Sequence, residues 1–160
     1  YSIKVLGNNE INDYFDKIDM SKFSLDQIRK SNTFGMTMFA RNTKIFKQFN
    51  DEVGYIIIFI DRIINTSKNN DIIFNALHTL FHECRHIQQF DYILEKENFK
   101  IQPALELMYL ETLTNEDYNN RIIEMDANIY SLNRIFSRTI KDFPLSKVYN
   151  YLKNKSEKGD

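Results

Sequence analysis

The chain has 160 residues and a single cysteine, carries a formal net charge of −1 at pH 7, and is 42% hydrophobic. This length suits one domain with its own core, expected over residues 1–160, and the charge gives no electrostatic footprint for direct nucleic-acid binding. The longest apolar run, residues 55–60, is far shorter than the roughly 20 residues of a membrane helix, so we expect no membrane span.

The cysteine content indicates the compartment. Cys84 stands alone and cannot form an internal disulfide, which fits a reducing environment, and we expect a cytoplasmic protein. The sequence starts at Tyr1 rather than methionine, which leaves open an upstream signal or domain. We interpret Cys84 as a small core residue rather than a metal ligand.

The first part of the chain mixes helical and strand patterns. Residues 8–18 have apolar side chains at helical spacing, and a capping-box pattern predicts a further short helix over residues 24–30. Residues 34–49 predict two short strands joined by a turn. The β-branched, apolar stretch 55–64 predicts the best strand of the chain, followed by a polar surface loop at residues 66–70.

A long helix is predicted after that loop. Asn70 can cap it, and Asp71 favours its first turn through the helix dipole. We expect the helix to run through the core, because its apolar residues form a broad face. These residues are Ile73, Ala76, Leu77, Leu80, Phe81, Cys84, Ile87 and Leu94.

Three more helices are predicted after this one. A proline in the first turn opens a helix over residues 103–113, a capping pattern opens the next over residues 115–136, and the last covers residues 144–152. Residues 154–160 are polar and predict a frayed tail. Together these elements predict an α+β fold class: a mainly helical single domain with a small, mostly antiparallel sheet preceding the long helix.

Residues 82–86 read His-Glu-Cys-Arg-His, an H-E-x-x-H motif in the middle of the long helix. His82 and His86 are four residues apart, so their imidazoles lie on one helix face and can bind the same metal ion. Glu83 lies about 100° round the helix, better placed to activate a water as general base than to ligate. The alternative is a core helix with incidental histidines, but all three histidines of the chain fall on this helix at i+4 steps.

A hydrolytic zinc site usually has three protein ligands and an open position for water, so a third ligand is required. His78 is one candidate, but three ligands along one straight helix would span about 12 Å, too far for one zinc ion. No histidine remains, and a carboxylate, Glu124 or Asp126, is the natural choice. The longer side chain favours Glu124, and Asn128 one turn later would lie behind the site, supporting a ligand.

The motifs H-E-x-x-H at 82–86 and E-x-D-A-N at 124–128 together resemble the ImmA/IrrE family of small zinc metallopeptidases, in the gluzincin group. The resemblance covers about residues 55–136 and implies one Zn²⁺ per chain, with Glu83 activating the water and three ligands: His82, His86 and Glu124. It also implies cleavage of another protein, often a regulator bound to DNA. Arg85 stands where the family usually has a small residue, and Asp126 replaces the usual glutamate.

The chemistry predicts a zinc metallopeptidase that hydrolyses peptide bonds of a protein or peptide substrate. An oxyanion donor is also expected, and the candidates are Tyr92, Tyr118, Arg121 and Tyr130. Two other classes remain: a catalytically silent metal-binding or regulatory interaction module with a zincin fold, and a structural zinc domain. An unligated Glu83 beside a ligand disfavours a structural site, which would favour cysteines.

Overall fold

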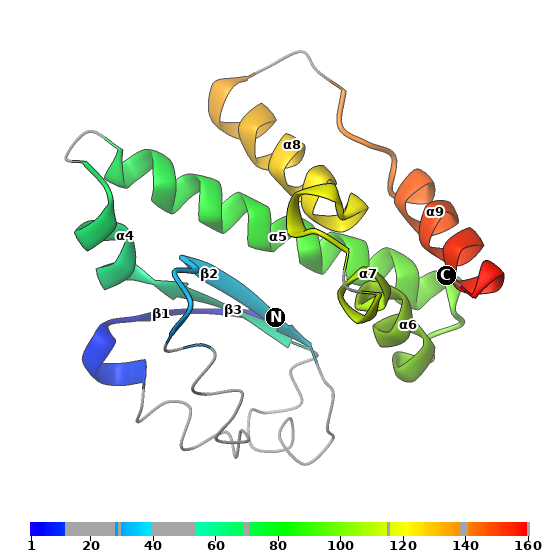
Figure 1. Cartoon of the computed structure of the whole chain (residues 1–160). Helices are drawn as coiled ribbons and strands as arrows, with labels where there is room; N and C mark the ends of the chain where they lie inside the picture. Colours follow the sequence, from blue (N-terminus) through cyan, green and yellow to red (C-terminus); the bar gives the residue numbers. More distant parts are fainter. Residues whose placement is uncertain are drawn as a thin grey trace. The chain divides into compact units, whose positions relative to one another are not determined.

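The computed structural model describes residues 1–11, 28, 30–39, 54–68, 71–114, 116–137 and 141–159 (Figure 1). Helices predominate, and a small sheet precedes the helix that carries the H-E-x-x-H motif, which confirms the α+β fold class. The chain forms two compact units, Tyr1–Leu80 and Phe81–Asp160. The elements are β1 (Ser2–Leu6), β2 (Gly35–Phe39), β3 (Gly54–Phe59), α4 (Ile60–Thr66), α5 (Ile72–Lys96), α6 (Ile101–Met108), α7 (Leu110–Leu113), the 3-10 helix η1 (Tyr118–Asn120), α8 (Ile122–Phe136) and α9 (Leu145–Lys158).

The sheet of the first unit has the order β1-β3-β2, with β3 in the centre (Figure 1). Strand β2 pairs antiparallel with β3, whereas β1 pairs parallel with it, so the sheet is mixed rather than mostly antiparallel. The parallel pair comes from residues 2–6, a strand that the sequence patterns did not predict. Central strand β3 is buried at four successive positions, Ile56 to Phe59, as expected for a strand paired on both edges.

The predicted strand over residues 55–64 is wrong in its second half, because β3 ends at Phe59 and α4 follows at once. Asp61 accepts a hydrogen bond from the Asn8 N–H at 2.6 Å, and Arg62 donates to the Ile28 carbonyl at 2.7 Å. Ile63 is fully buried. These three successive side chains therefore meet different parts of the unit, which the helical turn permits and the two-sided alternation of a strand does not.

Parts of the N-terminal predictions lie outside the described residues. Residues 8–11 are helical, in agreement with the helix predicted over 8–18, and Ile28 and Lys30 are helical within the predicted helix 24–30. Strand β2 matches the first of the two strands predicted over residues 34–49. The remainder of these three predictions falls on residues that the structure does not describe.

Helix α5 confirms the predicted long helix but not its predicted apolar core face. Ile73 is 75% exposed and Leu77 is 38% exposed. The buried residues of its second half are instead largely polar: His82, Glu83, Arg85, His86 and Gln89, together with Phe90 and Ile93. A polar face can be buried when its groups find hydrogen-bond partners, and α8 supplies them here.

The later helices differ from prediction at their ends. The helix predicted over residues 103–113 is divided into α6 and α7, which meet at Tyr109. Helix α8 begins at Ile122 rather than near residue 115, because η1 precedes it. At this start the buried carboxylate of Glu111 lies near the backbone of Ile122 and Ile123, and burial raises its pKa.

Helix α9 reaches Lys158, so the predicted tail over residues 154–160 is mostly helical. Its inner side buries Val148 and Leu152. Beyond the predicted end near residue 152, Lys153 pairs with Glu97, and Lys155 pairs with Glu116. These ion pairs lie on the last turns of α9, which the sequence pattern did not predict to be helical. In the described part of the chain, no helix combines the length and apolar character needed to cross a membrane.

Candidate metal centre

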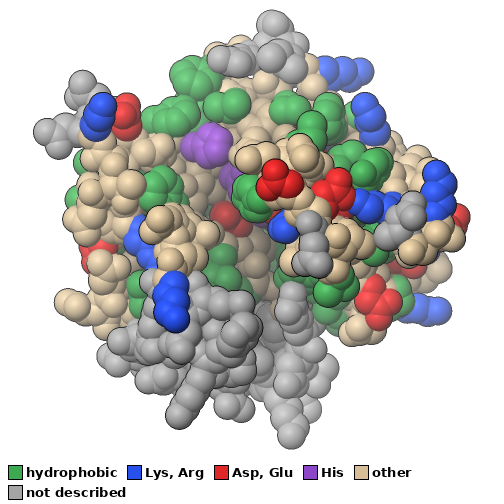
Figure 2. Space-filling model, in the orientation of Figure 1, with side chains coloured by type: hydrophobic (Ala, Val, Ile, Leu, Met, Phe, Trp, Pro, Cys, Tyr) green, Lys and Arg blue, Asp and Glu red, His purple; other side chains and the backbone are tan. Residues whose placement is uncertain are grey.

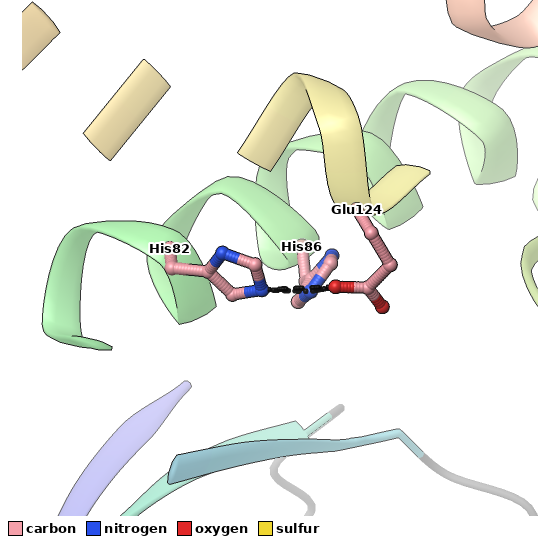
Figure 3. A group of neighbouring side chains, drawn as sticks. All are labelled: His82, His86 and Glu124. Atoms are coloured by element: carbon pink, nitrogen blue, oxygen red, sulfur yellow. Dashed lines mark hydrogen bonds and ion pairs between the residues drawn. The ribbon is translucent and has the colours of Figure 1, made fainter. Parts of the chain in front are cut away.

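Three side chains of the second unit converge on one point (Figure 3). His82 and His86 project from successive turns of α5, and Glu124 comes from the first turn of α8. The two Nε2 atoms are 3.0 Å apart, and Glu124 Oε2 lies 3.1 Å from Nε2 of His82 and 3.6 Å from Nε2 of His86. Zinc bonds of about 2.0–2.1 Å at tetrahedral angles separate neighbouring ligand atoms by about 3.3 Å, so this donor set fits zinc.

Both imidazoles are held from behind by amide oxygens. Nδ1 of His82 lies 3.0 Å from Oδ1 of Asn128, and Nδ1 of His86 lies 2.8 Å from Oε1 of Gln89. An Nδ1–H bond to an oxygen leaves the Nε2 lone pair free to bind a metal, as in many zinc sites. The sequence places Asn128 behind the site as a prediction, and the structure shows its contact with the His82 ring. Gln89 was missed, although its i+3 spacing from His86 puts the two on one helix face.

Charge is concentrated among the three converging side chains. Burial alone would lower the pKa of His86, but the hydrogen bond and the negative charge of Glu124 outweigh it and raise that pKa to about 9. Burial would raise the pKa of Glu124, but the hydrogen bonds to His82 and His86 hold it well below its usual value. Two imidazole nitrogens and a carboxylate oxygen facing one point require a positive charge between them, which a proton or a metal ion can provide.

The other expected site residues have different surroundings. Glu83 is buried and lies outside the three-residue group, and its charge contributes to raising the pKa values of His86 and Tyr118. His78 also lies outside the group, and its ring packs against Phe74 at 5.8 Å between centroids. Asp126, the alternative ligand, is fully buried and forms a salt bridge with Arg85 instead, at 2.8 Å from Nε to Oδ2.

The four oxyanion candidates separate by their contacts. Tyr118 forms a side-chain hydrogen bond with Glu124, and burial and the Glu124 charge raise its pKa, so its hydroxyl keeps its proton at neutral pH. Tyr92 packs against a tyrosine of α9, the ring of Tyr130 lies against the Arg85 guanidinium, and Arg121 donates to a backbone carbonyl. Of these four candidates, Tyr118 is thus the one whose hydroxyl bonds a member of the group His82, His86 and Glu124.

The centre is enclosed but not sealed. His82 is 7% exposed and His86 is 8% exposed, so both rings are largely withdrawn from water. Figure 2 shows histidine atoms on the face that it draws, and the histidines of the chain are His78, His82 and His86. A largely buried site strengthens electrostatic interactions among its groups, which suits both metal binding and polar catalysis.

Comparisons of this chain with protein-family models, with curated proteins and with solved structures gave no match. The assignment of the site therefore depends on its own residues and geometry.

Proposed function

We propose that the chain is a zinc-dependent metallopeptidase that binds one Zn²⁺ through His82, His86 and Glu124. The convergence of two Nε2 atoms and one carboxylate oxygen carries this proposal, since all three ligand atoms lie within 4.8 Å of one another. Two histidines and one glutamate form a ligand set used by catalytic zinc sites, which keep a fourth position for water. The H-E-x-x-H spacing in the sequence also supports the proposal, as does the burial of Glu83 outside the group of three ligands.

Glu83 is the proposed general base. When bound, zinc supplies Lewis acidity for the scissile carbonyl and lowers the pKa of the attacking water toward about 7. The Glu83 carboxylate accepts the proton of that water and later delivers it to the leaving amine. Three observations on Glu83 support this role. The residue is next to His82 on α5, it is buried, and its negative charge contributes to raising the pKa values of His86 and Tyr118.

Tyr118 is the proposed oxyanion donor. Its hydroxyl is protonated at neutral pH because burial and the Glu124 charge raise its pKa. A protonated phenol beside a ligand can donate a hydrogen bond to the oxygen that gains negative charge during peptide hydrolysis. Tyr118 is also 49% exposed, so one side of the residue is open to a substrate.

The proposed substrate is a protein or peptide. The family resemblance favours a regulatory protein as the substrate. The single cysteine favours a cytoplasmic location, and the net charge of −1 gives no footprint for direct nucleic-acid binding by this chain. A catalytically silent module that binds the metal or a partner remains the competing function.

Metal content tests the ligand set. The purified chain is expected to hold one zinc per molecule, and His82→Ala or His86→Ala is expected to lose it, because two remaining ligands bind zinc weakly. His78→Ala is the matched control, since it removes a histidine of the same helix that lies outside the group. Retention of a full zinc equivalent by either ligand variant would remove the assignment.

Proton transfer is tested with Glu83→Gln, which is nearly isosteric and leaves all three ligands in place. The variant should retain zinc and lose about 10²–10⁴-fold in the rate of cleavage. Zinc-loaded wild type and variant are incubated with lysate of the native host, and the new fragments and retained proteins are compared. If both produce the same fragments, or neither produces any while both retain the same partner, the silent binding module replaces the hydrolase.

A further inference from the structure

A buried glutamine on α5 has an orientation that the surrounding groups determine. Gln89 is 1% exposed, and its amide nitrogen donates to the Ile123 carbonyl at 2.9 Å and to Asp126 Oδ2 at 2.7 Å. A carbonyl and a carboxylate can only accept hydrogen bonds. Reversing the amide would place its oxygen against two acceptors, so the NH₂ group must face α8 and Oε1 must face His86.

Asp126 is held in its accepting role by Arg85. Nε of Arg85 donates to Oδ2 of Asp126 at 2.8 Å, and Nη2 donates to Oδ1 at 3.1 Å. Arg85 is itself anchored, because the Nη2 that faces Asp126 also donates to the Phe143 carbonyl at 2.8 Å. With three N–H groups directed at it, the Asp126 carboxylate has no donor role open to it.

The donor and acceptor roles in these hydrogen bonds also determine which nitrogen of His86 carries the hydrogen. Because Gln89 presents Oε1 to His86 at 2.8 Å, Nδ1 of that ring must carry the hydrogen. The lone pair of the neutral ring is then on Nε2, which faces His82 and Glu124. Arg85 and Asp126, the two residues that depart from the resembled family pattern, are thus partners in one buried arrangement.

We propose that Gln89, oriented by the Arg85–Asp126 ion pair, is a positioning residue that sets the tautomer and ring orientation of His86. Its importance for zinc affinity rests on the proposed function, whereas its effect on the tautomer does not. Loss of a group that supports a ligand from behind typically weakens metal binding 10–100-fold.

The test compares two neighbouring glutamines. Gln89→Met is close in size and removes the oxygen that faces His86, while leaving the Arg85–Asp126 pair intact. Gln88→Met is the matched control, because Gln88 also lies on α5 and bonds the Tyr130 hydroxyl of α8 and Nη1 of Arg85. Nη1 does not face Asp126, so both hydrogen bonds of the Arg85–Asp126 pair remain in this variant. Both variants lose buried or half-buried hydrogen bonds, so a merely structural role would affect them similarly.

The first readout is the ¹⁵N NMR spectrum of the metal-free proteins, recorded at increasing pH until the His86 ring signals stop changing and the neutral ring shows its tautomer. Wild type and Gln88→Met should show the hydrogen on Nδ1, and Gln89→Met should show a mixture of both tautomers. A pure Nδ1–H tautomer in Gln89→Met would overturn the proposal.

The second readout is the zinc dissociation constant by calorimetry. Gln89→Met should bind about 10–100-fold more weakly than wild type, and Gln88→Met should bind within about threefold of it. Equal affinities of the two variants would overturn the positioning role. If wild type binds no zinc, the proposed function fails, and the NMR result still decides the role of Gln89.

Discussion

Helix α5 is joined to α8 and to α9 by two different kinds of contact. Toward α8 the contacts are buried and polar, and they include the Arg85–Asp126 ion pair, whose side chains are 7% and 1% exposed. Toward α9 the ion pair lies just past the end of α5 and is more exposed, because Lys153 and Glu97 have 39% and 14% side-chain exposure. Both contacts are ion pairs, so we expect the difference in burial to make the Arg85–Asp126 pair constrain the site more strongly than the Lys153–Glu97 pair.

The largest expected effect comes from breaking the buried pair. Asp126→Ala leaves the Arg85 guanidinium buried without its carboxylate, which should lower the free energy of unfolding by about 3–5 kcal/mol. Glu124→Ala should cost less in the metal-free protein, because His86 can then release its proton and become neutral. Urea unfolding of the two metal-free variants measures this difference.

The same two variants should have the opposite order in zinc content. Glu124→Ala removes a proposed ligand and should lose the metal, whereas Asp126→Ala keeps all three ligands and should retain more of it, to the extent that it folds. Elemental analysis of folded protein at matched concentration provides the measurement. A lower zinc content in Asp126→Ala would transfer the third ligand position to Asp126.

The stability that the polar contacts between α5 and α8 provide should also depend on pH in the metal-free protein. The folded-state pKa of His86 is raised to about 9 from an ordinary value of 6.5, so its stabilising contribution is complete below pH 6.5. The contribution is lost as pH rises through about 9, and the unfolding free energy should fall across this window by up to about 3 kcal/mol. Urea unfolding between these pH values measures the slope.

Glu124→Gln is the control for this slope, because it removes the negative charge that raises the His86 pKa while preserving the size of the side chain. The slope should largely disappear in that variant. An unchanged slope would assign the pH dependence to groups outside the proposed centre.

Some of this interface could be predicted from the sequence, and some could not. The i, i+4 spacing of His82 and His86 suffices to place both rings on one helix face, and the reach of Glu124 favours it over Asp126 as their partner. The role of Gln89 depends on a backbone carbonyl and a carboxylate of α8, which no local pattern specifies. Hydrophobic periodicity even misled the prediction, because it assigned the buried face of α5 to apolar residues such as Ile73.

Element ends were the other source of error, for a related reason. The apolar run that forms β3 continues into α4, so composition alone does not show that the strand ends at Phe59. Contacts of Asp61 and Arg62 with distant segments accompany the change to helix. Helix α8 likewise begins later than predicted, because η1 precedes it, and its first residues lie beside Glu111 of α7. Long-range contacts, which sequence patterns do not contain, mark both boundaries.

The smallest expected effect comes from the surface pair at α9. Lys153→Ala removes an exposed ammonium group that water and salt already screen, so the unfolding free energy should fall by only about 0.2–1 kcal/mol. Glu97 keeps a hydrogen-bond partner in this variant, because the Tyr149 hydroxyl still donates to its Oε1 at 2.9 Å. Here the contrast with Arg85 is direct: one residue keeps a partner and solvent access, and the other loses its carboxylate inside the protein. Urea unfolding of Lys153→Ala and wild type at low salt and at about 1 M salt should show a difference that shrinks as the charges are screened. A loss as large as that of Asp126→Ala, insensitive to salt, would mean that burial does not explain the difference between the two interfaces.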